Sequence, residues 1–364
     1  MIEKITISEQ EAGKIHQNLG KIVIPTEQEI IESLENDPNT LKKALFNYSD
    51  WKEWYLHILD TLNNDAKSIL IMLPGITPNF PESDGSAYTQ ENNWKKELVG
   101  LQSYWWKSPF TYTLAELVWE KDSKWQSRII QVNYPMNDNE WWFNIQLFTQ
   151  KIQSYLNNIK NFKEKWISVY GASMWWKIAI YTAWEILKNG WKLENLILYA
   201  PAISTDLLVP PTNLLDKVPL DLATAFQKLI ALPFIDWQIK NSYKKDWWIE
   251  LSKEDLQKLW KAVWWYDVSW QQMKARLKFI ASSINNETFK KYIDLINKSW
   301  TTIVVLTSDI WNGTDGALVN SKIEEKIKQL FPNLYIKLVN IEWLPHVNVP
   351  QAANLHKKIL EENL

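Results

Sequence analysis

The sequence predicts an α/β protein, with a mostly parallel sheet, helices on both faces of that sheet, a helical cap insertion and an N-terminal helical extension. From Ser68 onward, short apolar segments alternate with long helical patterns. The apolar segments are nearly continuous, which is typical of strands that are covered on both faces. Strands that alternate with helices in this way indicate a parallel sheet.

The first 66 residues are expected to form helices. Residues 26–29 (TEQE) fit a capping box, which satisfies the free N–H groups at the start of a helix, and an apolar-periodic run follows at 30–34. Residues 37–40 (DPNT) interrupt this run and begin another helix. We expect this N-terminal extension, residues 1–66, to pack onto the main domain, because no residue in it points to a partner-binding surface.

The α/β core is expected at residues 67–203 and 300–364, with a helical cap between them at 204–299. Prolines punctuate the start of the cap segment, which then turns helical and shows no strong strand pattern. An insertion of this length between two strands predicts a cap over the carboxyl edge of the sheet. The expected core strands lie at 69–73, 129–133, 167–170, 196–200, 303–306 and 335–339, and the expected helices include 143–159 and 177–188.

The overall composition favours a protein without a nucleic-acid partner or a membrane span. The formal net charge is −2 and the pI is about 6.2, so no charge excess favours a polyanionic partner. The chain contains no cysteine, which excludes disulfides and thiolate chemistry and favours a reducing compartment. Residues 1–14 carry acidic side chains and lack the apolar stretch of a signal peptide, so none is expected, and no apolar run approaches the roughly 18 residues of a membrane span. We expect a cytoplasmic protein, and its oligomeric state stays open.

Glycine and tryptophan occur in abnormal numbers. The chain has 9 glycines among 364 residues, whereas proteins average roughly 7% glycine. It has 24 tryptophans, many of them in adjacent pairs. The deficit of glycine and the excess of tryptophan are therefore similar in size. Turns need residues that tolerate positive φ, and tryptophan is poor at this. Tryptophans in such turn-like contexts include Trp191, Trp300, Trp311 and Trp343.

We hypothesise that many of these tryptophans are glycines in the living organism. Some bacterial lineages read the codon UGA as glycine, whereas a common alternative code reads it as tryptophan. The excess falls at turns, which favours this UGA recoding over a genuinely tryptophan-rich protein that stacks sugars on its aromatic side chains. Trp51, Trp54 and Trp184 lie in apolar, helix-like contexts and are expected to be tryptophan.

The segment 167–179 (ISVYGASMWWKIA) contains the motif that carries chemistry. A G-x-S-x-G nucleophile elbow turns sharply from a strand into a helix, so that the serine hydroxyl stands clear and its neighbours must be small. Gly171 meets this requirement before Ser173, whereas Trp175 and Trp176 do not meet it afterwards. Glycine at both positions would give G-A-S-M-G-G, and an indole at 175 is expected to clash where strand and helix approach each other.

This motif, placed between an apolar strand and a helix, resembles that of the α/β-hydrolase superfamily. The resemblance spans about residues 68–206 and 300–364 and implies that Ser173 is the nucleophile. Among the four histidines, His346 alone stands in a loop just beyond a strand pattern. The base of the resembled family occupies that loop, so His346 is expected to take the proton from Ser173 and return it to the leaving group.

The resemblance also implies an acid and an oxyanion hole. The acid should follow the penultimate strand, where the loop 307–318 offers Asp315, our first choice, and Asp309 as the alternative. Either carboxylate would accept the imidazole N–H and stabilise the imidazolium, completing a catalytic triad. By resemblance, the backbone N–H groups of Met174 and Ile76 would form the oxyanion hole.

The implied activity is hydrolysis of an ester or a related acyl bond through an acyl-serine intermediate, as in esterases, lipases and thioesterases. The expected partner is a small-molecule acyl substrate, whose class the sequence does not define. No cofactor and no metal are expected, because the sequence lacks a P-loop, a G-x-G-x-x-G pattern and an HExxH motif. A non-catalytic binding or scaffolding protein of the same fold is the alternative.

Overall fold

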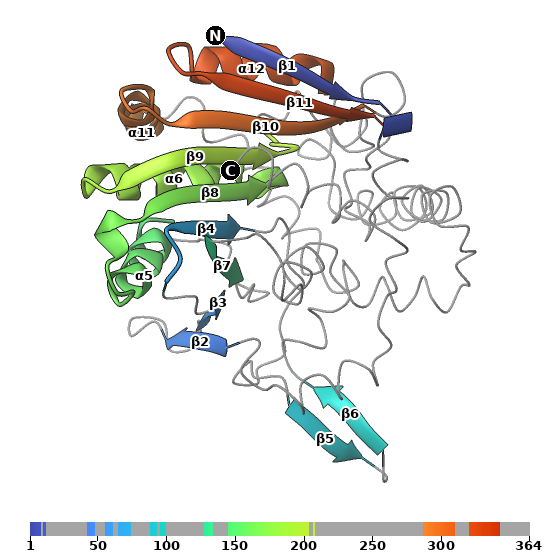
Figure 1. The fold of residues 1–364 in the computed structure, drawn as a ribbon, viewed down its shortest axis with the longest axis vertical. Helices are drawn as coiled ribbons and strands as arrows, with labels where there is room; N and C mark the ends of the chain where they lie inside the picture. Colours follow the sequence, from blue (N-terminus) through green and yellow to red (C-terminus); the bar gives the residue numbers. More distant parts are fainter. Residues whose placement is uncertain are drawn as a thin grey trace, which may run out of the picture.

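A computed structural model of the chain describes a large sheet with helices packed beside it (Figure 1). The described residues are 1–8, 10–11, 42–47, 55–60, 65–73, 88–92, 95–99, 127–133, 145–203, 207, 287–309 and 320–342. The strands of the large sheet are β1 Ile2–Ile7, β2 Lys42–Asn47, β3 Tyr55–Asp60, β4 Ser68–Leu73, β7 Ser127–Asn133, β8 Trp166–Ala172, β9 Lys192–Tyr199, β10 Thr302–Asp309 and β11 Ile336–Glu342.

Within the described residues, these nine strands follow the order β1-β11-β10-β9-β8-β4-β7-β3-β2. Every neighbouring pair from β1 to β7 is parallel, whereas β3 pairs antiparallel with both β7 and β2. The predicted α/β class with a mostly parallel sheet is therefore confirmed. Parallel strands end at one common edge, and the arrowheads in Figure 1 show this carboxyl edge on the right.

All six predicted core strands are present, as β4, β7, β8, β9, β10 and β11. Nearly continuous apolar sequences of this kind are typical of strands that are covered on both faces. Strand β4 shows this most clearly, since Ile69, Leu70, Ile71, Met72 and Leu73 are all buried. These strands and the helices beside them share one contiguous hydrophobic core.

Four helices of at least two turns accompany the sheet in the described part of the chain. Helix α6 packs against β8 and β9 and also contacts α5 and α11. The helices predicted at 143–159 and 177–188 correspond to α5 and α6, whereas α12 was not predicted. The bounds are α5 Ile145–Asn157, α6 Trp176–Lys188, α11 Glu287–Asn297 and α12 Ile323–Leu330.

The expectation that residues 1–66 form a helical extension is wrong for three described segments, because β1, β2 and β3 all belong to the large sheet. Ile2, Ile5 and Ile7 of β1 are half-buried beside more exposed polar neighbours, and branched side chains of this kind favour strands. The strand forms by pairing with β11, from Ile2↔Ile336 to Ile7↔Ile341, at the far end of the chain. Such a distant partner leaves no local sequence signal. The proposed capping box at 26–29 lies outside the described residues.

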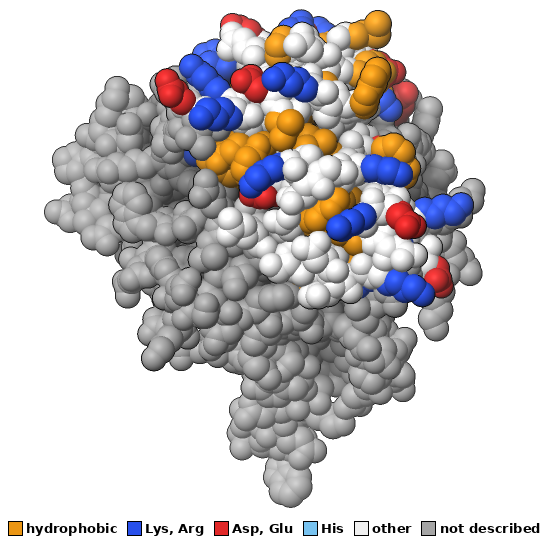
Figure 2. Space-filling view, turned by 90° about the vertical axis from the view of Figure 1, so that its left-hand side faces the viewer, with side chains coloured by type: hydrophobic (Ala, Val, Ile, Leu, Met, Phe, Trp, Pro, Cys, Tyr) orange, Lys and Arg blue, Asp and Glu red, His pale blue; other side chains and the backbone are white. Residues whose placement is uncertain are grey.

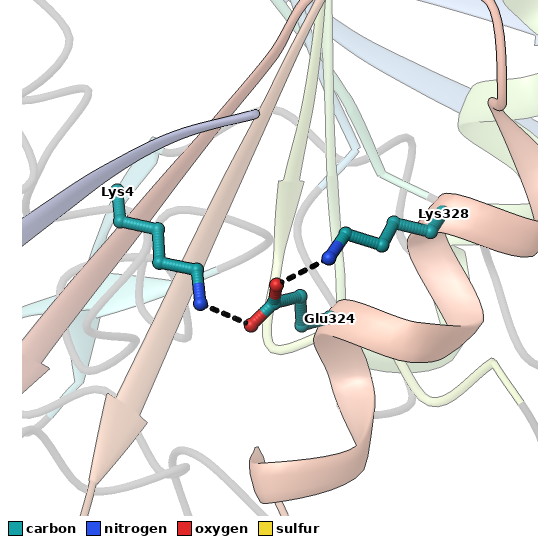
Figure 3. Close-up of polar contacts among 3 residues, drawn as sticks. All are labelled: Lys4, Glu324 and Lys328. Atoms are coloured by element: carbon teal, nitrogen blue, oxygen red, sulfur yellow. Dashed lines mark hydrogen bonds and ion pairs between the residues drawn. The ribbon is translucent and has the colours of Figure 1, made fainter. Parts of the chain in front are cut away.

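The edge strand β1 is also tied to α12 by charge (Figure 3). Glu324 Oε2 lies 2.8 Å from Lys4 Nζ, and Glu324 Oε1 lies 2.7 Å from Lys328 Nζ. Hydrogen bonds from Lys328 and then from Lys4 lower the pKa of the Glu324 carboxyl below its usual value. One carboxylate therefore joins two lysines from segments that lie more than 300 positions apart in the sequence.

The division into an extension, a core and a cap stays a prediction. Residues 208–286, which make up most of the predicted cap, lie outside the described residues. Helix α11, at the end of the predicted cap segment, packs against α6. Its Phe289 ring meets the Trp176 ring edge-on with centroids 5.5 Å apart, and its Tyr292 ring lies 4.2 Å from that of Trp184.

Candidate functional site at the carboxyl edge of the sheet

Ser173 occupies the turn between β8 and α6 in a backbone conformation that serine rarely adopts. Its φ is 51°. Ala172 before it is extended (φ −103°, ψ 144°), and Trp175, two residues after it, is helical (φ −76°, ψ −4°). Left-handed backbone is unfavourable for residues with a Cβ atom, by about 1–2 kcal/mol. The turn is therefore strained at the residue that the sequence motif predicts to be the nucleophile, and such strain is often found at functional sites.

A second strained residue lies next to this turn. Ala200 follows the last residue of β9 and has a φ of 40°. Its N–H donates to the carbonyl oxygen of Leu306 on β10 at 2.8 Å, and the N–H of Ala202 donates to the carbonyl oxygen of Ser173 at 3.2 Å. Two neighbouring strand ends are thus strained and hydrogen-bonded together. Ala200 was not predicted from the sequence, because the proline that follows it favours extended backbone and gives no signal of a positive φ.

Gly171 explains why the elbow needs small residues. A Cβ atom at this position would lie 2.5 Å from Ala179 Cβ, 3.0 Å from the carbonyl oxygen of Trp175 and 3.2 Å from Trp176 Cα. The predicted close approach of strand and helix is therefore present between Gly171 and Ala179. The nearest atoms of residues 175 and 176 belong to their main chains and not to their side chains.

The predicted clash of an indole at this corner is therefore wrong. Trp175 and Trp176 are both buried, with 3% and 0% of their surfaces exposed. The Trp176 Nε1–H donates to the carbonyl oxygen of Ala202 at 2.8 Å, in addition to its contact with Phe289. Both residues also have negative φ, so neither position demands glycine for backbone reasons. The structure accommodates indoles here because residues 175 and 176 approach Gly171 through main-chain atoms, the Trp175 carbonyl oxygen and Trp176 Cα.

The remaining predicted site residues are described in part or not at all. Met174 lies between Ser173 and Trp175 in the short 3₁₀ turn, and its side chain is not described. Asp309 is the last residue of β10, and only its backbone is described. Ile76, Asp315 and His346 lie outside the described residues.

The topology fixes the strand ends from which those residues follow. Ser173 directly follows β8, Asp309 ends β10, and Asp315 comes six positions later in the sequence. His346 follows β11, which neighbours β10. All three strands end at the same edge, and one strand, β9, separates β8 from β10, so those two strand ends lie roughly 10 Å apart.

Lys177 is a further unusual residue beside the elbow, and it was not among the site residues that the sequence predicted. It lies in the first turn of α6, four positions after Ser173, and is 4% exposed. Burial lowers the pKa of its amine from 10.5 to about 7. The apolar neighbours in WWKIAI were the only sequence signal of this burial. The lysine is therefore only partly charged at neutral pH.

The described residues give no sign of a metal centre or a membrane span. They contain no group of three or more His, Cys, Asp or Glu residues that could hold a metal ion. Among the helices that the structure describes, none has both the length and the apolar character that crossing a bilayer requires.

Comparisons with solved structures identify similar folds. A candidate aryl esterase from Burkholderia cenocepacia matches with a TM-score of 0.51 and 11% sequence identity, over 88% of this chain and 99% of that chain. A bromoperoxidase from Bacillus anthracis matches with a TM-score of 0.50 and 13% identity, over 88% of this chain and 99% of that chain. No protein-family model and no curated protein sequence matches the chain. At these identities the likeness concerns the fold.

Proposed function

We propose that this chain, which has the fold of the α/β-hydrolases, is a serine hydrolase with Ser173 as its nucleophile. The observation that supports this most directly is the φ of 51° at Ser173, at the turn from β8 into α6. A serine held in this strained conformation presents its hydroxyl away from the backbone and toward a substrate. The close Gly171–Ala179 approach keeps the turn sharp.

The reaction proposed is acyl transfer to water. His346 removes the proton from Ser173 as the hydroxyl attacks the acyl carbon, and then protonates the leaving group. Asp315, or Asp309 in its place, orients the imidazole and stabilises its charged form. The parallel topology supports this assignment, because the three residues follow or end strands at one edge of the sheet.

The oxyanion hole is proposed to consist of two backbone N–H groups, from Met174 and Ile76. The N–H of Met174 follows the strained Ser173 directly, and Ile76 comes three positions after the end of β4, the strand next to β8. Donors fixed in advance stabilise the negative charge that develops on the acyl oxygen. A small-molecule ester or related acyl compound is the proposed substrate, and a cytoplasmic location stays a prediction.

The glycine hypothesis stays part of the proposal at positions 175 and 176. The composition supports it, with 24 tryptophans and 9 glycines. The backbone conformation at both positions suits either residue and therefore favours neither. A non-catalytic protein of the same fold is the second candidate. It is favoured by the two buried indoles directly after the elbow, one of which binds the Ala202 carbonyl.

Labelling with a fluorophosphonate probe distinguishes the two candidates. We expect the probe to modify Ser173 and to leave a Ser173→Ala variant unmodified. Ser154 on α5 is a matched control, because its hydroxyl is exposed and donates to the Gln150 carbonyl at 3.0 Å. A Ser154→Ala variant should be labelled like the unchanged protein. Equal labelling of Ser173→Ala, or no labelling of either protein, would contradict the proposed nucleophile.

A further inference from the structure

We infer that the native residue at position 94 is glycine, and that the β5–β6 hairpin requires it there. Strands β5 Tyr88–Asn92 and β6 Lys95–Val99 pair antiparallel from Tyr88↔Val99 to Asn92↔Lys95. Figure 1 shows the hairpin apart from the large sheet. Because Asn92 pairs with Lys95, the connection consists of two residues, Asn93 and Trp94.

A connection of two residues restricts the type of turn. Such hairpins use type I′ or type II′ turns, because only these match the twist of the paired strands. A type II′ turn needs glycine at its first position, which is Asn93 here. A type I′ turn needs positive φ at both positions, and the commonest pair is asparagine followed by glycine. Asn93 therefore fits the first position of a type I′ turn, and the second position, 94, calls for glycine.

Tryptophan is poorly suited to that second position. A side chain with a Cβ atom makes the left-handed conformation about 5- to 30-fold less favourable in the equilibrium constant, and glycine removes this penalty. No described tryptophan has positive φ, since the non-glycine residues with positive φ in the described segments are Asn161, Ser173 and Ala200. The pairing of β5 with β6 therefore makes position 94 the strongest candidate for a native glycine.

Two other tryptophans provide the contrast, because their indoles have partners. The ring of Trp184, on α6, lies 4.2 Å from the Tyr292 ring and 4.6 Å from the ammonium of Lys188. The Trp191 ring packs edge-on against Phe162 with centroids 4.5 Å apart, and its backbone N–H donates to the Ile186 carbonyl in the last turn of α6. These positions use a large aromatic side chain, whereas position 94 connects two paired strands.

Trp300 is a second position where nothing in the structure requires an indole, in contrast to Trp184. It precedes the first residue of β10 by two positions and is fully exposed, at 102%. The amino ends of the parallel strands face the viewer in Figure 2, where hydrophobic side chains are scattered among lysines and arginines. Full exposure leaves an indole without packing partners, so glycine would cost the fold little there.

The direct test is the mass of a peptide from the protein isolated from its source organism. Trypsin should release residues 68–95, which contain position 94, and fragmentation of this peptide identifies that residue. We expect glycine at position 94 and tryptophan at Trp184, whose peptide serves as a control for correct identification of tryptophan. Tryptophan at position 94 would overturn the inference, whether or not Ser173 is catalytic.

A second test uses the recombinant full-length chain and separates the backbone requirement from the loss of the indole. Trp94→Gly should protect the β6 amides, residues 95–99, from hydrogen exchange about tenfold more than Trp94→Ala does. Trp94→Ala is the matched control, because it removes the indole but keeps the Cβ atom. Equal protection in the two variants would overturn the requirement for glycine at this turn.

Discussion

The elbow between β8 and α6 and the edge strand β1 are held in place by different forces. At the elbow, the helix lies so close to the strand that Gly171 has no room for a Cβ atom, and Ser173 is strained. At the edge, β1 is held by its parallel ladder with β11 and by the ion pair between Lys4 and Glu324, whose side chains are partly exposed. Close packing tolerates almost no change, whereas exposed ion pairs contribute little. Function should therefore be sensitive at the elbow and insensitive at the edge.

The largest effect expected concerns the proposed chemistry and not the fold. His346→Ala should lower kcat/KM by about 10³- to 10⁴-fold, because the serine loses its base, while the urea midpoint stays unchanged. Steady-state hydrolysis of a chromogenic ester measures the rate. Asp315→Asn should reduce the rate more than Asp309→Asn does, and the reverse order would move the acid to Asp309. Near-normal turnover in His346→Ala would contradict the assignment of the base.

The next largest effect tests the close packing at the elbow. Gly171→Ala should destabilise the chain by about 3 kcal/mol, because the new Cβ atom would collide with Ala179 Cβ and with main-chain atoms. Urea denaturation followed by circular dichroism measures the change.

Gly190→Ala is the matched control for Gly171→Ala. Gly190 comes two positions after α6, has a φ of 74° and would leave an added Cβ in open space, so this change should cost only about 1 kcal/mol. Ala179→Gly combined with Gly171→Ala should recover part of the loss, since the closest contact is then removed. Equal destabilisation by the two single changes would show that the elbow is not tightly packed.

The buried amine at the elbow predicts a stability that rises with pH. The pKa of Lys177 is about 7 in the folded chain and near 10.4 in an unfolded one, so the unfolded state binds more protons between these values. Stability should therefore increase as the pH rises from about 7 toward 10. Lys177→Met should stabilise the chain by about 2 kcal/mol at pH 6, with the gain fading by pH 10. Urea midpoints at pH 6, 8 and 10 measure this, and a gain independent of pH would contradict burial of the charged amine.

The comparison also shows which features the sequence could predict. The six core strands were predictable because most of them contain nearly continuous apolar runs, as β4 does with five buried residues in succession. The elbow was predictable because a glycine, a serine and a following helix form a local motif. Strand β1 was not predictable, because it depends on pairing with β11 at the other end of the chain. Local patterns indicate elements that are stable for local reasons, and they miss elements that depend on distant partners.

Site details were predictable only where the motif itself contains them. The strain at Ala200 and the burial of Lys177 both arise from packing between neighbouring elements, which a single sequence does not show. The expected clash of Trp175 and Trp176 failed for a related reason. The motif requires closeness of the main chains at Gly171, while the direction of the next two side chains depends on where α6, α11 and Ala202 lie.

The smallest effect is expected at the β1 edge, and it should depend on pH and salt. Glu324→Gln should lower the stability of the β1 contact by about 0.5 kcal/mol at pH 7, because its partners Lys4 and Lys328 are 62% and 55% exposed. The folded pKa of Glu324 lies below its unfolded value, so its contribution is present at neutral pH and is lost as the pH falls below about 4. Hydrogen exchange of the β1 amides measures the change.

Glu325→Gln is the matched control for the edge, because it makes the same charge change on α12 at a carboxylate whose side-chain partner is Gln329. It should leave β1 protection nearly unchanged, and hydrolysis should be unaffected in both variants. High salt should reduce the effect of Glu324→Gln, since exposed ion pairs are screened. If Glu324→Gln instead lowered the rate of hydrolysis, the edge and the elbow would be energetically coupled. The proposed separation between a structural edge and a functional elbow would then fail.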